Sequence, residues 1–166
     1  MSSVRFVFPK LRLAAQLKEA GGLTVADAVE AAHDNLGVLK PQGLTALQAA
    51  TQEAMECFGR FPQSFSAEAL QELYGISARA VGIGAICDAP AADTAFISLC
   101  ALLDHLSNAQ LWDLQPIAVH VQTLQLLAVG VREQLDPISL NQILAGLQKV
   151  TGRYSAASKA ALAASG

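Results

Sequence analysis

The chain has 166 residues, a length that suits one domain with a buried core. Apolar residues make up 52% of it, only 5% are aromatic and 15% are charged, and alanine and leucine, both strong helix formers, dominate the apolar share. The formal net charge is −3 and the eleven Lys and Arg residues are scattered, which excludes the dense basic face that nucleic-acid binding needs. These properties predict an all-α protein, an antiparallel helical bundle packed with small side chains.

The sequence also argues against a membrane protein or a secreted one. No stretch reaches the roughly 18 uninterrupted apolar residues of a membrane span, and the opening MSSVRFVFPK lacks the apolar core and cleavage pattern of a signal peptide. Cys57, Cys87 and Cys100 show neither C-x-x-C spacing nor clustered histidines. We therefore expect a cytoplasmic protein with reduced thiols, no metal, no cofactor and no membrane contact.

The first strong helical pattern runs from Thr24 to Pro41. Thr24 and Asp27 have the spacing of a capping box, and Pro41, which lacks an N–H group, is expected to stop the helix. A second helix is expected over residues 44–59, packed antiparallel against the first across the short turn KPQG. The apolar stripe expected to face the core in the first helix consists of Val25, Val29, Ala32, Leu36 and Leu39.

A third and a fourth helix are expected in the middle of the chain. The third starts at Ser66, a good N-cap, and its inner face narrows from leucines to small residues by Gly84. The fourth follows the segment CDAPAAD, where Asp88 and Asp93 are interpreted as caps at the helix start. A catalytic pair of carboxylates is the less favoured interpretation of these two residues.

Two more helices complete the predicted domain. The fifth follows the segment SNAQLWD, and the sixth starts at Asp136, an N-cap followed by Pro137 in the first helical turn. From Tyr154 the chain is rich in alanine and serine, with little to bury, so a frayed end or a weak helix is expected there. The predicted organisation is an N-terminal arm (1–23), one bundle domain (24–152) with a four-helix core and additional terminal helices, and a flexible C-terminal tail (153–166).

The run SARAVGIGAI, residues 77–86, places a lone charge, Arg79, beside two glycines, Gly82 and Gly84. A nucleotide-binding loop would need a third glycine where Cys87 stands, and a strand before the run. The simpler interpretation is a helix segment whose small residues let another backbone come close, although each glycine lowers helix propensity.

No catalytic set is recognisable in the sequence. The histidines His33, His105 and His120 fall on three different predicted helices without a partner four residues away, and the motif H-E-x-x-H is missing. Each is interpreted as a surface or core-edge histidine. We expect no enzyme activity.

A phosphorelay interpretation needs an exposed histidine with a cation one turn later, written H-x-x-K-G in histidine-phosphotransfer modules, where the lysine attracts the phosphoryl oxygens. Arg79 and Ala80 stand at the place of the Lys-Gly pair. Counting back three positions from Arg79 gives Ile76, which cannot carry phosphate.

The segment ARAVGIGAICDAPAADTAFISLCALLDHL, residues 78–106, is similar in layout to the second and third helices of histidine-phosphotransfer bundles. The opening GGLTVADAVEAAHDNLGVL, the tripeptide SLC and the helix VHVQTLQLL resemble small bacterial chemotaxis proteins of the CheE type. The resemblance implies a phosphotransfer-like bundle of bacterial signalling. Since Ile76 stands at the acceptor position, it implies docking without the usual phosphoacceptor.

The leading hypothesis is a non-catalytic adaptor that binds a response-regulator receiver domain or a chemotaxis histidine kinase. One alternative is an active phosphotransfer protein that uses His120 or His33, although neither has a cation one turn later. Another is a helical oligomer with a structural role, and a homodimer would suit the adaptor as well. The predicted docking face consists of Arg79, Ala80, Gly82 and Gly84.

Overall fold

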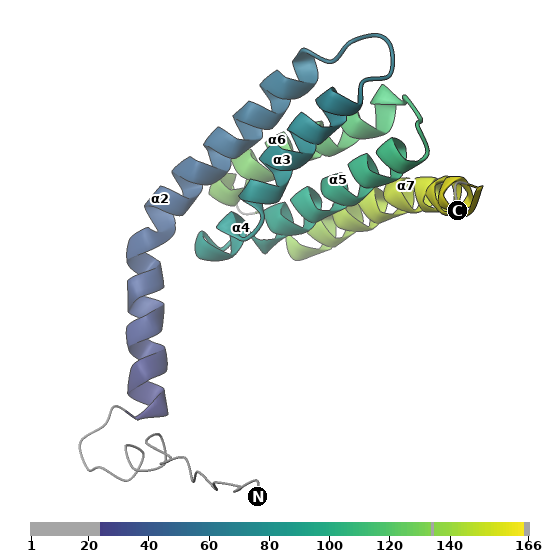
Figure 1. Cartoon of the computed structure of the whole chain (residues 1–166). Coiled ribbons are helices and arrows are strands. Elements are labelled where there is room, and N and C mark those ends of the chain that lie inside the picture. The colour runs from purple at the N-terminus through teal and green to yellow at the C-terminus, as the bar shows by residue number, and fades with distance from the viewer. Residues whose placement is uncertain (1–23, 134, 165–166) are drawn as a thin grey trace, which may run out of the picture. The chain divides into compact units, whose positions relative to one another are not determined.

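The computed structural model describes residues 24–133 and 135–164, and every regular element within these ranges is an α-helix (Figure 1). The prediction of an all-α protein is therefore confirmed. The chain divides into two units, Met1–Gly37 and Val38–Gly166. The N-terminal arm expected over residues 1–23 lies outside the described residues.

The first described helix, α2, runs unbroken from Val25 to Gly59 with Pro41 inside it. The predicted stop at Pro41, and with it the antiparallel pair of helices across KPQG, is wrong. A proline removes one helical N–H, the donor for the carbonyl of Gly37, and leaves the other hydrogen bonds of the helix available. The signal for one continuous helix is the unbroken spacing of three or four residues through the proline, at Leu36, Leu39, Gly43 and Leu47.

The two parts of α2 differ in burial. All residues from 24 to 42 are exposed, so the prediction that Val25, Val29 and their stripe face a core is wrong. From Gly43 onward about one residue per turn is buried, because this part of the helix packs into the core of the second unit. The buried residues of α2 are Gly43, Leu47, Thr51, Ala54 and Cys57.

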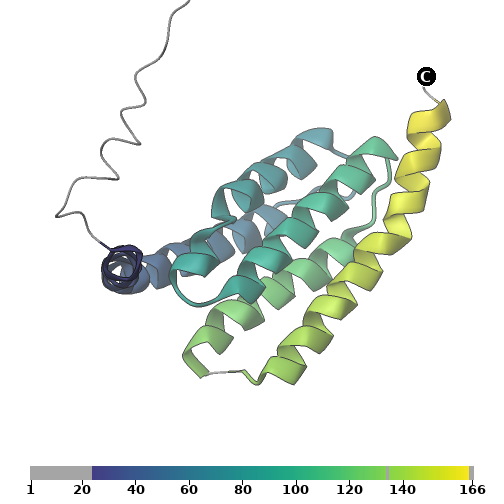
Figure 2. The same cartoon turned by 90° about the horizontal axis from the view of Figure 1, so that it is seen from below.

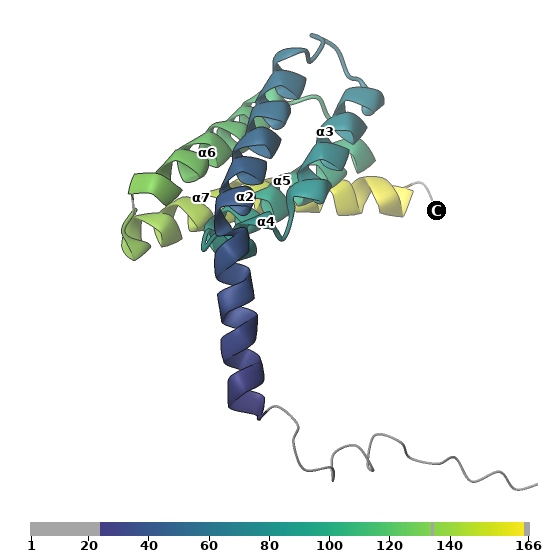
Figure 3. The same ribbon diagram turned by 90° about the vertical axis from the view of Figure 1, so that its left-hand side faces the viewer.

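Helix α5 (Pro90–Asn108) is the centre of the second unit. It contacts α3 (Ala67–Ala80), the short helix α4 (Ile83–Ile86), α6 (Leu114–Glu133) and α7 (Pro137–Ala164) (Figure 1, Figure 2). Helices α6 and α7 also contact each other (Figure 3). With neighbours on most sides, α5 buries a wide face made of Ala92, Ala95, Phe96, Leu99, Leu102, Leu103 and Leu106.

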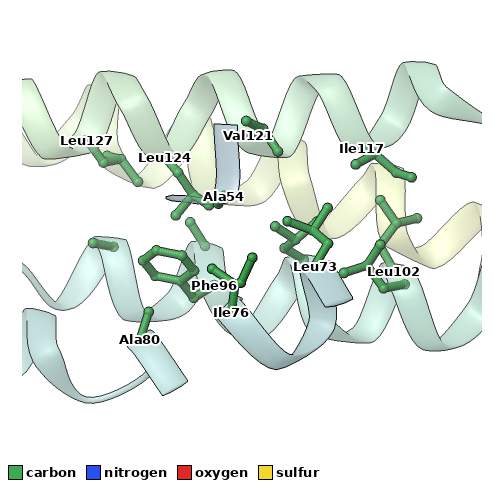
Figure 4. Packing of buried hydrophobic residues seen from close by; sticks show 14 of the residues in the cluster. Ala54, Leu73, Ile76, Ala80, Phe96, Leu102, Ile117, Val121, Leu124 and Leu127 are labelled. Carbon is green, nitrogen blue, oxygen red and sulfur yellow. The ribbon is translucent and has the colours of Figure 1, made fainter. Parts of the chain in front are cut away.

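The core contains few aromatic rings. Phe96 is fully buried, and in Figure 4 it lies among Ile76 and Ala80 of α3 and Leu124 of α6. Leucine, isoleucine and alanine, with Val121, Cys57 and Cys87, fill the rest of the cluster. Burying one such large aliphatic side chain stabilises a fold by about 1.5–3 kcal/mol, so the aliphatic content is sufficient to hold the helices together.

The predicted helix starts are confirmed by hydrogen bonds. Thr24 and Asp27 form the reciprocal capping box, with N–O distances of 3.1 and 3.2 Å. Ser66 Oγ accepts the N–H of Ala69 at 3.1 Å, and Asp136 Oδ1 accepts the N–H of Ser139 at 2.9 Å. Each bond satisfies an N–H that has no partner inside its helix.

The predicted helix ends were less accurate. α3 ends at Ala80 instead of continuing to Gly84. α7 continues to Ala164 without a break at residue 152, because its last turns still have contacts: Tyr154 donates a hydrogen bond to the Asp113 carboxylate, and Ser158 is only 3% exposed.

Candidate functional site

The glycine-rich run begins in α3 and then leaves the helix. A turn at Val81 and Gly82 separates α3 from α4, and Gly82 has φ +96°, a conformation that favours glycine. At Gly84 a Cβ atom would lie 2.4 Å from the carbonyl oxygen of Ala89, so no side chain fits. The close approach expected for the small residues is therefore observed, but between parts of one loop rather than along a helix face.

Three backbone N–H groups of this loop converge on one carboxylate. Gly82 and Gly84 donate to Asp93 Oδ1, both at 2.9 Å, and Ala85 donates to Asp93 Oδ2 at 2.8 Å. A concave set of N–H groups is also what phosphate-binding loops offer to an anion. Here the anion is the protein's own Asp93, in the first turn of α5, so the loop is already occupied.

Asp88 and Asp93 were predicted to cap α5, and both have other roles. The N-cap residue of α5 is Ala89, with Pro90 in the first turn. Asp88 forms an exposed ion pair with Lys40 of α2, while Asp93 holds the loop that precedes its helix. The two carboxylates therefore tie neighbouring segments to the start of α5.

The predicted docking face is only partly accessible. Arg79 is exposed, and its Nη2 donates to Glu53 Oε1 at 3.0 Å. Gly82 is exposed too, whereas Ala80 is 1% exposed and Gly84 is buried. A partner can therefore touch Arg79 and Gly82, and it has to compete with Glu53 for the guanidinium group.

The three histidines lie in different environments. His33 is exposed on α2, and its Nδ1 donates to the carbonyl of Val29 at 3.0 Å. His105 is half-buried in the last turn of α5. His120 is 0% exposed, so its interpretation as a surface or core-edge histidine is wrong.

His120 is the centre of a buried polar cluster that joins three helices. Its Nδ1 lies 2.8 Å from the carbonyl oxygen of Pro116, which can only accept, so Nδ1 carries a proton. Its Nε2 lies 3.0 Å from Ser98 Oγ of α5 and 3.3 Å from Thr151 Oγ1 of α7, and the two hydroxyl oxygens are 3.0 Å apart. Burial lowers the pKa of His120, so at neutral pH the ring is uncharged and Nε2 is a hydrogen-bond acceptor.

A serine hydroxyl on an imidazole nitrogen is the pairing of a catalytic nucleophile and its base. Ser98, however, lies in the interior of α5, where backbone N–H groups donate to carbonyls one turn earlier and do not form an oxyanion hole. The geometry therefore supports a structural role, in which the cluster satisfies a buried imidazole and fixes α5, α6 and α7 against one another.

A cavity of about 330 Å³ lies between α5 and α7, beside this cluster. Ser98 and Thr151 contribute their side chains to its lining. The remaining side chains around it are mostly apolar: Ile97, Ala101, Leu144 and Leu147, together with Thr94 and Gln148.

Ser98 and Thr151 were not predicted as partners of His120. The burial of His120 had a signal in the sequence, since it lies three residues after Ile117 and four before Leu124, both on the buried face of α6. Its partners had none, because they come from two other helices whose register against α6 is set by packing.

The cysteines do not add a reactive group. All three are free, and burial raises the pKa of Cys57 and Cys100 to about 11, so these thiols stay protonated at neutral pH.

Within the part of the chain that the structure describes, no three His, Cys, Asp or Glu residues are grouped so as to hold a metal ion. None of the described helices is long and apolar enough to cross a membrane.

Comparison with known proteins found no matching family model, no matching curated protein and no matching solved structure. Function is therefore inferred from the side chains and surfaces described above.

Proposed function

We propose that the chain is a non-catalytic helical adaptor of bacterial chemotaxis or two-component signalling, acting in the cytoplasm, that binds a receiver domain or a histidine kinase. The observation that supports this best is the exposed apolar stripe at the start of α2. Val25, Val29 and Leu36 are 82%, 50% and 46% exposed and lie on one face of the helix. An apolar stripe of this kind is what a helix inserts into the groove of a protein partner.

The opposite face of the same helix favours a protein over other partners. Asp27, Glu30 and Asp34 follow one another at spacings of three and four residues, on the side away from the stripe. Their negative charge disfavours nucleic acid and anionic lipid, which are negatively charged themselves. The stripe consequently suits a groove whose rim is neutral or basic.

Within the second unit we propose an antiparallel four-helix core of phosphotransfer type, formed by α3, α5, α6 and the buried part of α2. In this arrangement Arg79 takes the place of the lysine in H-x-x-K-G, and Ile76, 4% exposed, takes that of the phosphoacceptor. Arg79 is thus a second, separate contact for a partner's acidic groups. A homodimer remains compatible with both contacts.

The test is calorimetric titration of the full chain with the receiver domains and histidine kinases encoded near it. Val29→Glu should weaken binding at least tenfold, because it puts a charge into an apolar contact. The matched control is Ala31→Glu, which adds the same charge to an exposed position of the same helix away from the stripe. Failure of every candidate to bind contradicts the proposal. Equal losses of affinity in the two variants would show that the apolar stripe is not the contact surface.

A phosphorylation assay separates the adaptor from the phosphotransfer alternative. His33 is the exposed candidate, while His120 would have to leave the core to meet a receiver's aspartyl phosphate. The chain is incubated with autophosphorylated kinase and followed for acid-labile phosphate. The adaptor predicts no label, and label that disappears in His33→Gln would establish the alternative.

A further inference from the structure

The cavity between α5 and α7 has the size and walls of a small-molecule site. Its volume of about 330 Å³ is roughly twice that of the ~150 Å³ protein cavity that holds benzene. Ala101, Leu144 and Leu147 give it an apolar wall, and Ile97 is 55% exposed beside it. A site of this kind favours a bicyclic aromatic or similar apolar body, fixed by a small number of polar contacts.

The polar side chains in the lining are the Gln148 amide and the hydroxyl groups of Thr94, Ser98 and Thr151, and the Thr94 hydroxyl donates to the Pro90 carbonyl oxygen. The Ser98 and Thr151 hydroxyl groups belong to the His120 cluster. His120 Nε2 needs a donor, because it is a buried acceptor. Ser98 at 3.0 Å and Thr151 at 3.3 Å are the two donors within reach. Whichever hydroxyl donates to Nε2, the other can donate to it across the 3.0 Å between the two oxygens.

In either arrangement the two hydroxyl oxygens keep only lone pairs for a molecule in the cavity. The hydroxyl that donates to Nε2 has to keep its proton there, and the second hydroxyl gives up its bond to the first, or the 3.5 Å contact from Thr151 to the Ser98 carbonyl oxygen, if it turns toward a ligand. A donor on the ligand leaves all of these bonds in place. The site therefore discriminates by hydrogen-bond polarity. At these two hydroxyl groups a ligand with a donor is therefore favoured over a ligand that offers only acceptors or a negative charge.

We propose that this cavity binds a small, uncharged, largely apolar molecule with one hydrogen-bond donor, of the class of indoles and phenols, whose donor bonds to the Ser98 and Thr151 oxygens. The site lies on α5 and α7, so it is independent of the α2 stripe and of Arg79. It gives the chain a small-molecule ligand in addition to its protein partner.

The test compares indole with 1-methylindole, which has the same ring system but no N–H donor. Each is titrated into the full chain while NMR follows the amide and methyl signals of Ile97, Leu144 and Thr151. We expect saturable shifts confined to the cavity residues, and tighter binding of indole by about three- to tenfold, the effect of one neutral hydrogen bond. Absence of saturable shifts, shifts centred elsewhere, or equal affinities for the two probes would overturn the proposal.

A variant tests the role of the hydroxyl groups directly. Thr151→Val replaces one hydroxyl with a methyl group of similar size and leaves the Ser98 oxygen as the remaining acceptor. The ratio of the affinities for indole and 1-methylindole should therefore decrease, while 1-methylindole binds within about twofold of the original affinity. Thr123→Val is the matched control, because Thr123 Oγ1 donates to the carbonyl of Val119 on α6, outside the cavity. A preference for indole that is unchanged in Thr151→Val overturns the assignment of the donor contact. Should Thr151→Val lose its helical circular dichroism, the two probes on the unaltered chain still decide.

Discussion

Among single residues, Asp93 shows how a pattern typical of ligand binding can serve the fold. A run with two glycines and a lone arginine is compatible with an anion-binding loop, and the loop does bind an anion. The carboxylate comes from Asp93, eleven residues after Gly82. Residue spacing alone does not distinguish a loop that binds phosphate from one whose N–H groups already bind a side chain of the same protein. The difference depends on where α5 begins, because this places the Asp93 carboxylate against the loop.

Removal of this carboxylate should destabilise the fold. In Asp93→Ala three N–H groups lose a charged acceptor, each bond being worth about 1.5–3 kcal/mol when fully buried. The N–H groups of Gly82 and Ala85 are exposed and turn to water, so we expect the free energy of unfolding to fall by about 2–3 kcal/mol in total. Urea unfolding followed by circular dichroism measures this change.

The control for Asp93→Ala is Asp104→Ala, which removes an exposed carboxylate from the same helix. It should change the free energy of unfolding by less than about 0.5 kcal/mol. A similar loss in both variants would mean that the net charge of α5, and not the loop contact, matters.

At the level of elements, α2 combines a well-packed half with a half that has no buried residue. Most of the stability of a helix in a protein comes from tertiary packing, which this half lacks, and Gly37 and Pro41 weaken it further. The exposed half of α2 is consequently the place where we expect local opening at low free energy.

Pro41→Ala should stabilise the exposed half of α2 against local opening. The substitution restores an N–H donor for the Gly37 carbonyl and removes the ring that opposes it, an effect of up to about 3 kcal/mol in a helix interior. We expect amide hydrogen exchange in residues 25–40 to slow by at least about tenfold. Gln42→Ala, at an exposed position that already has its N–H, should slow exchange far less. Unchanged exchange in Pro41→Ala would show that the proline does not limit the helix.

The elements also show which parts of the fold the sequence could predict. The helix starts at Thr24, Ser66 and Asp136 were predicted correctly, because capping depends on residues within one turn. The continuation through Pro41 was not, because a proline inside a helix removes only one of its hydrogen bonds. The end of α3 at Ala80 was not, because the turn at Gly82 is held by a bond to Asp93, eleven residues later in the chain. The burial of His120 was not predicted either, although its spacing to Ile117 and Leu124 indicates it, and its partners on α5 and α7 have no signal in the sequence.

At the level of the whole molecule, the His120 cluster links the stability of the bundle to pH. It connects α5, α6 and α7, so protonation of the ring disturbs contacts that these helices share. The second proton would go to Nε2, which then loses its role as acceptor for the hydroxyl groups. The folded state accordingly favours the neutral ring, in agreement with the lowered pKa of His120.

The direction of the pH effect follows from this shift. In the unfolded chain the imidazole has a pKa near 6.5, and in the folded chain burial lowers it. Between the two values the unfolded chain binds the proton and the folded chain does not, so stability is complete above about pH 6.5 and falls as the pH decreases through this window. The slope is at most about 1.4 kcal/mol per pH unit, and we expect a loss of about 1–2 kcal/mol between pH 7 and pH 5.

Urea unfolding at pH 7, 6 and 5 measures this loss, and two variants assign it. His120→Gln removes the titrating ring, so the free energy of unfolding should be lower at pH 7 but nearly constant down to pH 5. His33→Gln, at an exposed position, should retain the original slope. Asp136, whose pKa is lowered by hydrogen bonds from Ser139, titrates below its usual 3.8 and so acts outside the window. If His120→Gln keeps the slope of the unaltered chain, another group carries the pH dependence and the buried ring is not the proton-linked element of the bundle.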